Sequence, residues 1–253
     1  MIADNADAKT DAKKPKTAEM HPGPGFRIKS HIERPDPAVI EGFAAFDTPA
    51  VSDLMNRLFT MNWAIHCLTP PELRVLGPAC TVKVFPGDNL MVHKSLDLAH
   101  PGDVIVVDAA STTNHAVLGD LVSTKARHRG IAGFVVDGLV RDLPGILSLG
   151  DFPVFARGVT PIGPLHRGPG EVNFPVSVGG IVVNPGDLII GDVVGVVVVP
   201  REYAPTLLRR LRLQAETEAN YLKAVAEGRF SNAWVDDTLA DAGVTGEDDP
   251  STW

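Results

Sequence analysis

The fold is decided by the stretch Val135-Val136-Asp137-Gly138-Leu139-Val140-Arg141-Asp142, in which an apolar run passes into polar residues. Phe134 to Val136 is predicted to be a buried strand, because a short unbroken apolar run suits a strand covered on both faces. Asp137-Gly138 is typical of a strand end, and a short loop is expected to lead to Arg141 and Asp142. Ligands of open α/β sheets bind beyond the carboxyl ends of strands, so this loop is a candidate functional site.

Strands and helices are predicted to alternate around this stretch. Upstream, Ala79 to Phe85 and Asp103 to Val107 are expected to be strands. A helix, together with the residues that lead into it, is expected next over Val117 to Arg129. Gly130 is expected to end this helix. Downstream, Arg141 to Leu149 is expected to be a short helix. This alternation favours an α/β fold.

From Val154 onward the pattern becomes rich in β-structure, and no linker precedes it. Short apolar runs joined by Gly, Asn and Pro turns are typical of strands that pack against the first half of the same domain. The expected strands are Val172 to Val178, Ile181 to Val183, Asp187 to Ile190 and Val194 to Val199.

Helices are predicted near both ends of the folded region. Asp36 to Phe46 and Pro49 to Leu58 are expected to be helical, and Arg201 to Gly228 is expected to form one long helix with an apolar stripe. Residues 1–25 are predicted to be a disordered extension, 26–228 a single catalytic domain that includes the long helix, and 229–253 an acidic tail without clear pattern.

Composition excludes several classes of function. The formal net charge of -8 argues against a nucleic-acid-binding surface, which needs clustered Lys and Arg. The two cysteines, Cys67 and Cys80, suit a reducing compartment rather than a disulfide framework. No apolar run is long enough to span a membrane and no secretory signal precedes the fold, so a cytoplasmic protein is expected.

The first candidate site is Leu118-Gly119-Asp120-Leu121-Val122, at the start of the helix that runs to Gly130. A glycine at this junction lets an anion approach the backbone, and the free N–H groups of the first helical turn bind a carboxylate or phosphate. The alternative is structural: Asp120 caps the helix and Gly119 only makes the turn.

The second candidate site is the adjacent pair Arg141-Asp142. The planar guanidinium of Arg141 suits an anionic oxygen. Asp142 suits a hard cation, and a single carboxylate suffices for Mg²⁺, which keeps several waters. The alternative is again structural, with Asp142 as a helix cap and Arg141 on the surface. The spacing Asp-x20-Arg-Asp from Asp120 to Asp142 arises by accident in about one chain in ten.

The context of that spacing is more specific. It includes Gly119 before Asp120, Arg129-Gly-Ile-Ala-Gly133, Val136-Asp-Gly138 and Phe155-Ala-Arg-Gly-Val-Thr160. With these motifs, Asp36 to Gly228 resembles the RraA-like family, which comprises the regulator of ribonuclease activity A and the class II 4-hydroxy-4-methyl-2-oxoglutarate/4-carboxy-4-hydroxy-2-oxoadipate aldolases. The intact Asp-x20-Arg-Asp signature favours the aldolase branch. The implied fold is a compact three-layer β/β/α core, similar to phosphohistidine swivelling domains, with a long C-terminal helix.

The resemblance also implies roles for individual residues. Backbone amides around Leu121 and Val122 would hold the carboxylate of a pyruvyl group, and Arg141 would contact its 2-oxo oxygen. Asp142 would bind Mg²⁺ or Mn²⁺, while Asp120 would orient waters at the metal or move a proton. An acid from a neighbouring subunit is also implied, and the choice between Glu216 and Glu218 stays open.

The implied reaction is retro-aldol cleavage of a 4-hydroxy-2-oxo acid to pyruvate, with decarboxylation of oxaloacetate through the same enolate. A divalent cation beside Arg141 would stabilise that enolate. The implied assembly is a homotrimer or homohexamer. Two rivals stay open: a non-catalytic ribonuclease regulator, and a related lyase or hydratase for a sugar acid.

Other features carry weaker expectations. His115 and His128 flank the candidate site, and the histidines lack the spacing of a metal motif. Lys125 is read as a surface lysine rather than a Schiff-base residue. The glycine-rich segment from Gly163 to Gly170 is expected to be a flexible loop that covers the site. Gly191-Asp-Val-Val-Gly195 lacks the second acid that the family often carries here, which weakens the inference about substrate.

Overall fold

The computed structural model describes residues 19–244. The predicted disordered extension therefore lies mostly outside the described residues, as does the last part of the predicted tail. The described chain forms two compact units that divide after Ala204, and each is presented separately.

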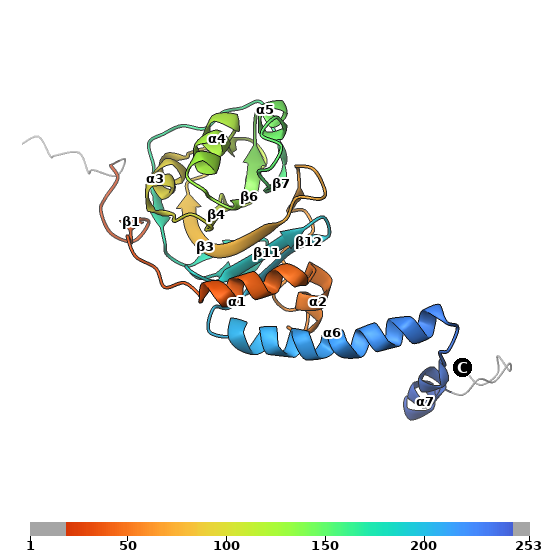
Figure 1. Cartoon of the computed structure of the whole chain (residues 1–253). Coiled ribbons are helices and arrows are strands. Elements are labelled where there is room, and N and C mark those ends of the chain that lie inside the picture. Colours follow the sequence, from red (N-terminus) through yellow and green to blue (C-terminus); the bar gives the residue numbers. More distant parts are fainter. Residues whose placement is uncertain (1–18, 245–253) are drawn as a thin grey trace, which may run out of the picture. The chain divides into compact units, whose positions relative to one another are not determined.

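The centre of the first unit is a mostly parallel sheet. Its strands follow the order β3 (Val75–Val84), β4 (Val104–Asp108), β6 (Gly133–Val140) and β7 (Val154–Val159). Parallel pairing joins β3 to β4, β4 to β6 and β6 to β7 (Figure 1). The predicted alternation of strands and helices is confirmed, since parallel neighbours need crossover connections. Shorter strands extend the sheet: β1 (Phe26–Ile28), β2 (His66–Cys67), β5 (Ala116–Leu118) and β8 (Gly170–Val172).

One face of this sheet is covered by helices. These are α3 (Leu90–Leu98), α4 (Asp120–His128) and α5 (Leu143–Leu147), which lie together on the same side in Figure 1. Ile105 and Val107 of β4 belong to the apolar core on this side, together with Val92 and Val122 from the helices. Alternate residues of a strand face opposite sides, so the remaining β4 side chains serve a second core.

The second core lies on the opposite face and is closed by strands. Val104 and Val106 of β4 pack there with Ile189 and Val198. Those partners come from the antiparallel pair β11 (Leu188–Asp192) and β12 (Gly195–Val199), and the hairpin β9 (Val176–Val178) with β10 (Ile181–Val183) adds further residues. Helices, sheet and strands make three layers, and the predicted α/β fold class is confirmed.

Strand β6 is longer than the sequence pattern indicates. The predicted end at Asp137-Gly138 is wrong, because the strand continues to Val140 through a bulge. There the register with β7 shifts between Val136 and Leu139. A bulge adds one residue to one strand of a pair and changes where the following side chains point. Arg141 and Asp142 therefore follow β6 directly rather than after a loop.

The N-terminal helices are shorter than predicted. Helix α1 (Pro37–Gly42) continues as a 3-10 turn over Phe43–Ala45, and α2 (Thr48–Asp53) ends well before Leu58. Asp36 and Asp47 cap them by accepting hydrogen bonds from the N–H groups of Ala38 and Ala50. The caps confirm the predicted starts of both helices.

Other elements also differ from the sequence prediction. The run Val172 to Val178 is not one strand, because β8 ends at Val172 and β9 begins at Val176. Helix α3 was not predicted at all. Residues Ala116–Leu118 form strand β5 rather than an approach to a helix, and α4 begins only at Asp120. In α3 the buried apolar side chains are Met91, Val92 and Leu96, and the polar residues 93–95 interrupt them after Val92, which makes the apolar stripe narrow.

The second unit is helical. Helix α6 (Ala204–Ala226) confirms the predicted long C-terminal helix, and α7 (Ala233–Asp241) occupies part of the tail for which no pattern was predicted. The two acids considered for a neighbouring site, Glu216 and Glu218, are exposed on α6. Within residues 19–244, no helix is both long and apolar enough to cross a lipid bilayer.

Candidate active site

A pocket of about 360 Å³ brings the predicted site residues together. It lies between the first turns of α3 and α4, the residues that follow β6, and the segment 164–166. All six predicted residues line it: Gly119, Asp120, Leu121, Val122, Arg141 and Asp142. The remaining lining residues are Asn89, His93, Leu118, Lys125, Pro164 and His166.

Helix α4 presents its N-terminus to this pocket. Gly119 is buried at the N-cap position and has no side chain to supply a capping bond. The N–H groups of a first helical turn lack acceptors within the helix, so they are available to an anion. One of them is engaged in this structure, because the Leu121 N–H donates to Asp120 Oδ1 at 2.7 Å. This contact to the next residue is not a capping bond, because α4 has no side-chain cap, and the Asp120 side chain also lines the pocket.

The pair Arg141-Asp142 is anchored by its backbone. The Arg141 N–H donates to the carbonyl of Leu118 at 2.9 Å, and this bond joins the residue after β6 to the last residue of β5. Asp142 has a left-handed backbone with φ of 52° and stands at the N-cap position of α5. Its side chain makes no capping bond there, so the structural alternative of a helix cap does not account for Asp142.

The side chains of the pair contact each other. Arg141 Nε donates to Asp142 Oδ2 at 2.8 Å, and the two side chains are 41% and 40% exposed. The terminal nitrogens of Arg141 bond no acceptor within the described part of the chain. A pocket that offers a half-exposed guanidinium and a half-exposed carboxylate can bind an anion and a cation side by side.

Glycines allow these groups to converge. A Cβ atom placed on Gly119 would lie 2.8 Å from Asp142 Oδ2 and 2.8 Å from Arg141 Cγ. A Cβ on Gly145 would lie 2.6 Å from Asp120 Oδ2. Larger residues at 119 or 145 would therefore displace a candidate carboxylate.

The donor set fits a hard divalent cation. Among the described residues, no group of three His, Cys, Asp or Glu side chains could surround a metal. The pocket instead offers the carboxylates of Asp120 and Asp142. Mg²⁺ commonly takes only one or two protein carboxylates and completes its shell with waters and substrate, so such a sparse set is compatible with it.

Sequence reasoning missed Asn89 and His93 in the wall of this pocket, whereas Pro164 and His166 belong to the segment that was expected to cover the site. The ring of His166 is hydrogen-bonded to Asn89, with 2.6 Å between Nδ1 and Oδ1, and it lies edge-on to His93 with 5.6 Å between centroids. Burial lowers the pKa of His93, and electrostatic interaction with Lys125 and with His166 lowers it further. Asn89 and His93 are four residues apart in α3, a helix that was not predicted, so no signal placed them here.

His115 and His128, the two histidines that the sequence places beside the candidate site, lie outside this pocket. His128 is exposed at the last residue of α4, and His115 packs where a Cβ on Gly87 would meet its ring. Neither lines the pocket.

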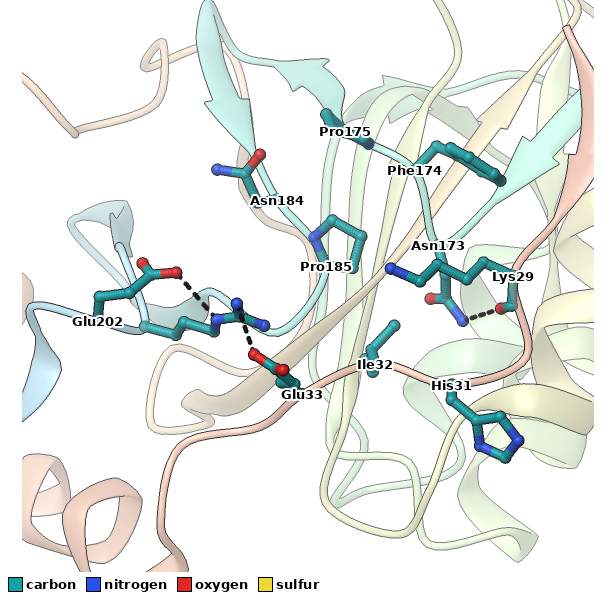
Figure 2. A pocket seen from close by; sticks show the side chains of 11 residues that line it. Lys29, His31, Ile32, Glu33, Asn173, Phe174, Pro175, Asn184, Pro185 and Glu202 are labelled. Atoms are coloured by element: carbon teal, nitrogen blue, oxygen red, sulfur yellow. Dashed lines mark hydrogen bonds and ion pairs between the residues drawn. The ribbon is translucent and has the colours of Figure 1, made fainter. Parts of the chain in front are cut away.

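A larger pocket of about 720 Å³ contains none of the predicted residues (Figure 2). Its arginine, Arg201, is already paired: Nη2 lies 2.7 Å from Glu33 and Nε donates to Glu202 at 3.0 Å. The Asn173 amide there donates to the Lys29 carbonyl, as Figure 2 shows. Volume alone does not make this the better candidate, since its strongest anion-binding group is occupied.

Comparison with known proteins identifies the family of this chain. A family model described as RraA-like, Aldolase/RraA, matches residues 48–198 and so includes every predicted site residue. The chain belongs to the RraA-like family. The resemblance stated from the sequence motifs is thereby confirmed.

Two relatives within the RraA-like family have names that provisionally assign them as aldolases. A Halalkalibacterium halodurans protein is 42% identical over 181 residues, which cover 71% of this chain and 85% of that protein. Its name provisionally assigns it as a 4-hydroxy-4-methyl-2-oxoglutarate aldolase. An Ectopseudomonas mendocina protein with the same provisional name is 36% identical and covers 49% of this chain and 76% of its own length.

Two similar solved structures have names that refer instead to inhibitors of RNase ES or of RNA processing. Streptomyces coelicolor RraAS2, described as an unusual member of the RNase ES inhibitor RraA family, matches with a TM-score of 0.68 and 28% identity. The match covers 76% of this chain and 99% of that one. RraA from Thermus thermophilis, described as an RNA-processing inhibitor, matches with a TM-score of 0.56 and 31% identity over 61% of this chain and 93% of that one. The RraA-like family thus includes proteins named as enzymes and proteins named as regulators.

Proposed function

We propose that this protein is a divalent-metal-dependent aldolase that cleaves a 4-hydroxy-2-oxo acid, such as 4-hydroxy-4-methyl-2-oxoglutarate or 4-carboxy-4-hydroxy-2-oxoadipate, to pyruvate. Decarboxylation of oxaloacetate is a second expected activity, because it yields the same pyruvate enolate. The observation that carries the proposal is the convergence of Gly119, Asp120, Arg141 and Asp142 on one pocket. The names of the aldolase relatives support the same reaction class.

Each residue has a task in the proposed reaction. The N–H groups of the first turn of α4 bind the carboxylate of the pyruvyl portion, since a helix N-terminus favours an anion. The unpaired terminal nitrogens of Arg141 donate to the 2-oxo oxygen, where negative charge grows as the carbon–carbon bond opens. Asp142 would hold Mg²⁺ or Mn²⁺, and the bound cation would supply further positive charge for that oxygen. Asp120 would orient waters there or move a proton.

The proposal is tested by measuring pyruvate release in a coupled assay. The purified protein is offered 4-hydroxy-4-methyl-2-oxoglutarate or oxaloacetate with Mg²⁺ or Mn²⁺, and then the same substrates after treatment with a chelator. Turnover is expected with metal, loss of turnover with chelator, and recovery when metal is restored. A protein that releases no pyruvate from a panel of 2-oxo acids with either metal would instead fit the non-catalytic regulators of the family.

We further propose that the working assembly is a homotrimer or homohexamer to which α6 contributes an acid from a neighbouring copy. Glu216 and Glu218 are the candidates, and both are exposed. Light scattering gives the assembly. Glu216→Gln and Glu218→Gln, compared for pyruvate release, identify which acid acts: the acting residue lowers turnover, and the other serves as its control.

A further inference from the structure

The segment that contains His166 is held firmly in place. On one side of it, the Leu165 N–H donates to the Gly87 carbonyl at 2.7 Å and the Leu165 carbonyl accepts from Asn89 N–H at 2.9 Å. On the other side, the Arg167 N–H donates to Asp88 Oδ2 at 2.6 Å. The prediction of a flexible loop is therefore wrong for this part of the segment, since the backbone is fixed on both sides of His166.

The ring of His166 is held as well. With the Asn89 amide oriented so that Oδ1 faces the ring at 2.6 Å, Oδ1 accepts and His166 Nδ1 carries the proton. In the neutral ring the lone pair then belongs to Nε2. An imidazole whose tautomer is set by a neighbouring acceptor is the arrangement that proton-transfer histidines use.

Asn89 is committed to this ring rather than to its helix. It occupies the N-cap position of α3, where Asn side chains commonly bind a first-turn N–H, yet it makes no capping bond. Asp88 Oδ1 accepts from the Leu90 N–H in its place. Asn89 is only 3% exposed, so its buried oxygen depends on the His166 ring for a donor.

The other polar groups of the pocket are less suited to accept a proton. Within residues 19–244, no hydrogen bond orients the ring of His93, the second imidazole of the pocket. Arg141 donates only, and Asp142 Oδ2 already accepts from it. Asp120 Oδ1 accepts from the Leu121 N–H. His166 thus offers a positioned lone pair in the same pocket as the Arg141 guanidinium and the carboxylates of Asp120 and Asp142.

We propose that His166 is the catalytic base that removes the 4-hydroxyl proton of the substrate, and that Asn89 is its positioning residue. This inference rests on the proposed aldolase function. The proton passes from the C4 hydroxyl to Nε2, the C4–O bond becomes a carbonyl, and the C3–C4 bond breaks. The electron pair of the C3–C4 bond passes into the enolate of pyruvate, whose oxygen accepts hydrogen bonds from Arg141. The imidazolium then returns its proton to water, and C3 takes one proton from water, so the reaction consumes no net proton.

Two substrates separate this role from a structural one. Aldol cleavage of 4-hydroxy-4-methyl-2-oxoglutarate needs a base for the hydroxyl, whereas decarboxylation of oxaloacetate has no hydroxyl and needs none. In His166→Ala, kcat for the aldol is expected to fall by about 10²-fold or more, the usual contribution of a positioned base. Oxaloacetate decarboxylation by the same preparation is expected to stay within about threefold of the unaltered protein, which also shows that the variant is folded.

Two more variants sharpen the test. Asn89→Leu removes the acceptor and leaves His166 present, so it is expected to lower aldol kcat by about tenfold with little change in KM or in decarboxylation. Added imidazole is expected to restore part of the aldol activity of His166→Ala. His128→Ala, an exposed histidine outside the pocket, is the matched control and keeps both activities.

The outcomes are distinguishable. If the unaltered protein cleaves neither substrate, the aldolase function itself fails. If it cleaves both and His166→Ala keeps its aldol rate, only the role of His166 is overturned. An equal loss of both activities in His166→Ala, without rescue by imidazole, also overturns it, because the residue would then support the pocket rather than the hydroxyl step.

Discussion

Arg141 and Arg201 each line a pocket, and their surroundings differ. Arg201 lies in the larger pocket and is bonded to Glu33 and Glu202 (Figure 2). Arg141 lies in the smaller pocket and is bonded to Asp142 through Nε alone. Both are partly exposed, so burial does not separate them.

The difference is in hydrogen-bonding capacity. A guanidinium has five N–H donors, and those already given to protein carboxylates are unavailable to a ligand. The terminal nitrogens of Arg141 are uncommitted within residues 19–244, while Nη2 and Nε of Arg201 are both engaged. The smaller pocket is therefore the better place for an anionic substrate, although the larger has twice its volume.

The strongest test of this comparison replaces each arginine by alanine. Arg141→Ala is expected to lower kcat for pyruvate release by roughly 10²–10³-fold, the usual loss when a group that stabilises developing negative charge is removed. Its half-exposed ion pair contributes little to folding, so the free energy of unfolding should change by less than about 1 kcal/mol. Steady-state kinetics and urea denaturation measure the two quantities.

The matched variant is Arg201→Ala. It should leave kcat within about twofold, since Arg201 lies outside the candidate site, and it should lower stability by at most about 1 kcal/mol through the lost ion pairs. Unfolding of Arg141→Ala, or a large kinetic loss in Arg201→Ala, would reverse the assignment of the two pockets.

A smaller effect is expected from Gly119→Ala. The added Cβ would meet Asp142 Oδ2 and Arg141 Cγ at 2.8 Å, so both side chains must move by a fraction of an ångström. Misplacement on that scale costs up to about 10²-fold in rate, and we expect a loss of about tenfold in kcat with little change in Tm. Calorimetry beside the kinetic assay checks this, and a fall in Tm without a kinetic effect would contradict it.

The smallest effect is expected from Lys125→Ala. A metal-dependent mechanism has no Schiff base, so kcat should stay within about threefold. Because the charge of Lys125 helps to lower the pKa of His93, removing it should raise that pKa, which proton NMR of the imidazole ring can follow. Loss of all activity, together with trapping of substrate on the unaltered protein by borohydride, would point to a lysine-based mechanism instead.

Much of the fold followed from local pattern. The apolar runs of β4 and β11 are long enough to be recognised as buried strands, and the aspartates before Pro37 and Ala50 mark the starts of α1 and α2. The predicted site residues also meet in space, because Gly119 and Arg141 both follow parallel neighbours, β5 and β6, whose carboxyl ends lie at one edge.

The rest depended on contacts between distant segments. The apolar face of α3 is narrow, so its helix, and with it Asn89 and His93, could not be recognised from spacing. His166 looked like part of a flexible glycine-rich loop because its anchors, Gly87 and Asp88, are far away in the sequence. Local pattern thus located the half of the pocket that carries the Arg-Asp pair, and tertiary structure placed Asn89 and His93 in its wall.

Because of the bulge in β6, the number of residues in this strand decides whether Arg141 reaches the pocket. Between Val136 and Leu139, three residues of β6 advance against two of β7. A deletion of Gly138 would restore even pairing and draw Arg141 toward the buried position of Val140. Such a protein would keep an apolar, strand-forming sequence and yet lose its guanidinium from the pocket. Among descendants of this chain, a change of one residue in length here is therefore a sharper marker of lost chemistry than many changes of residue type.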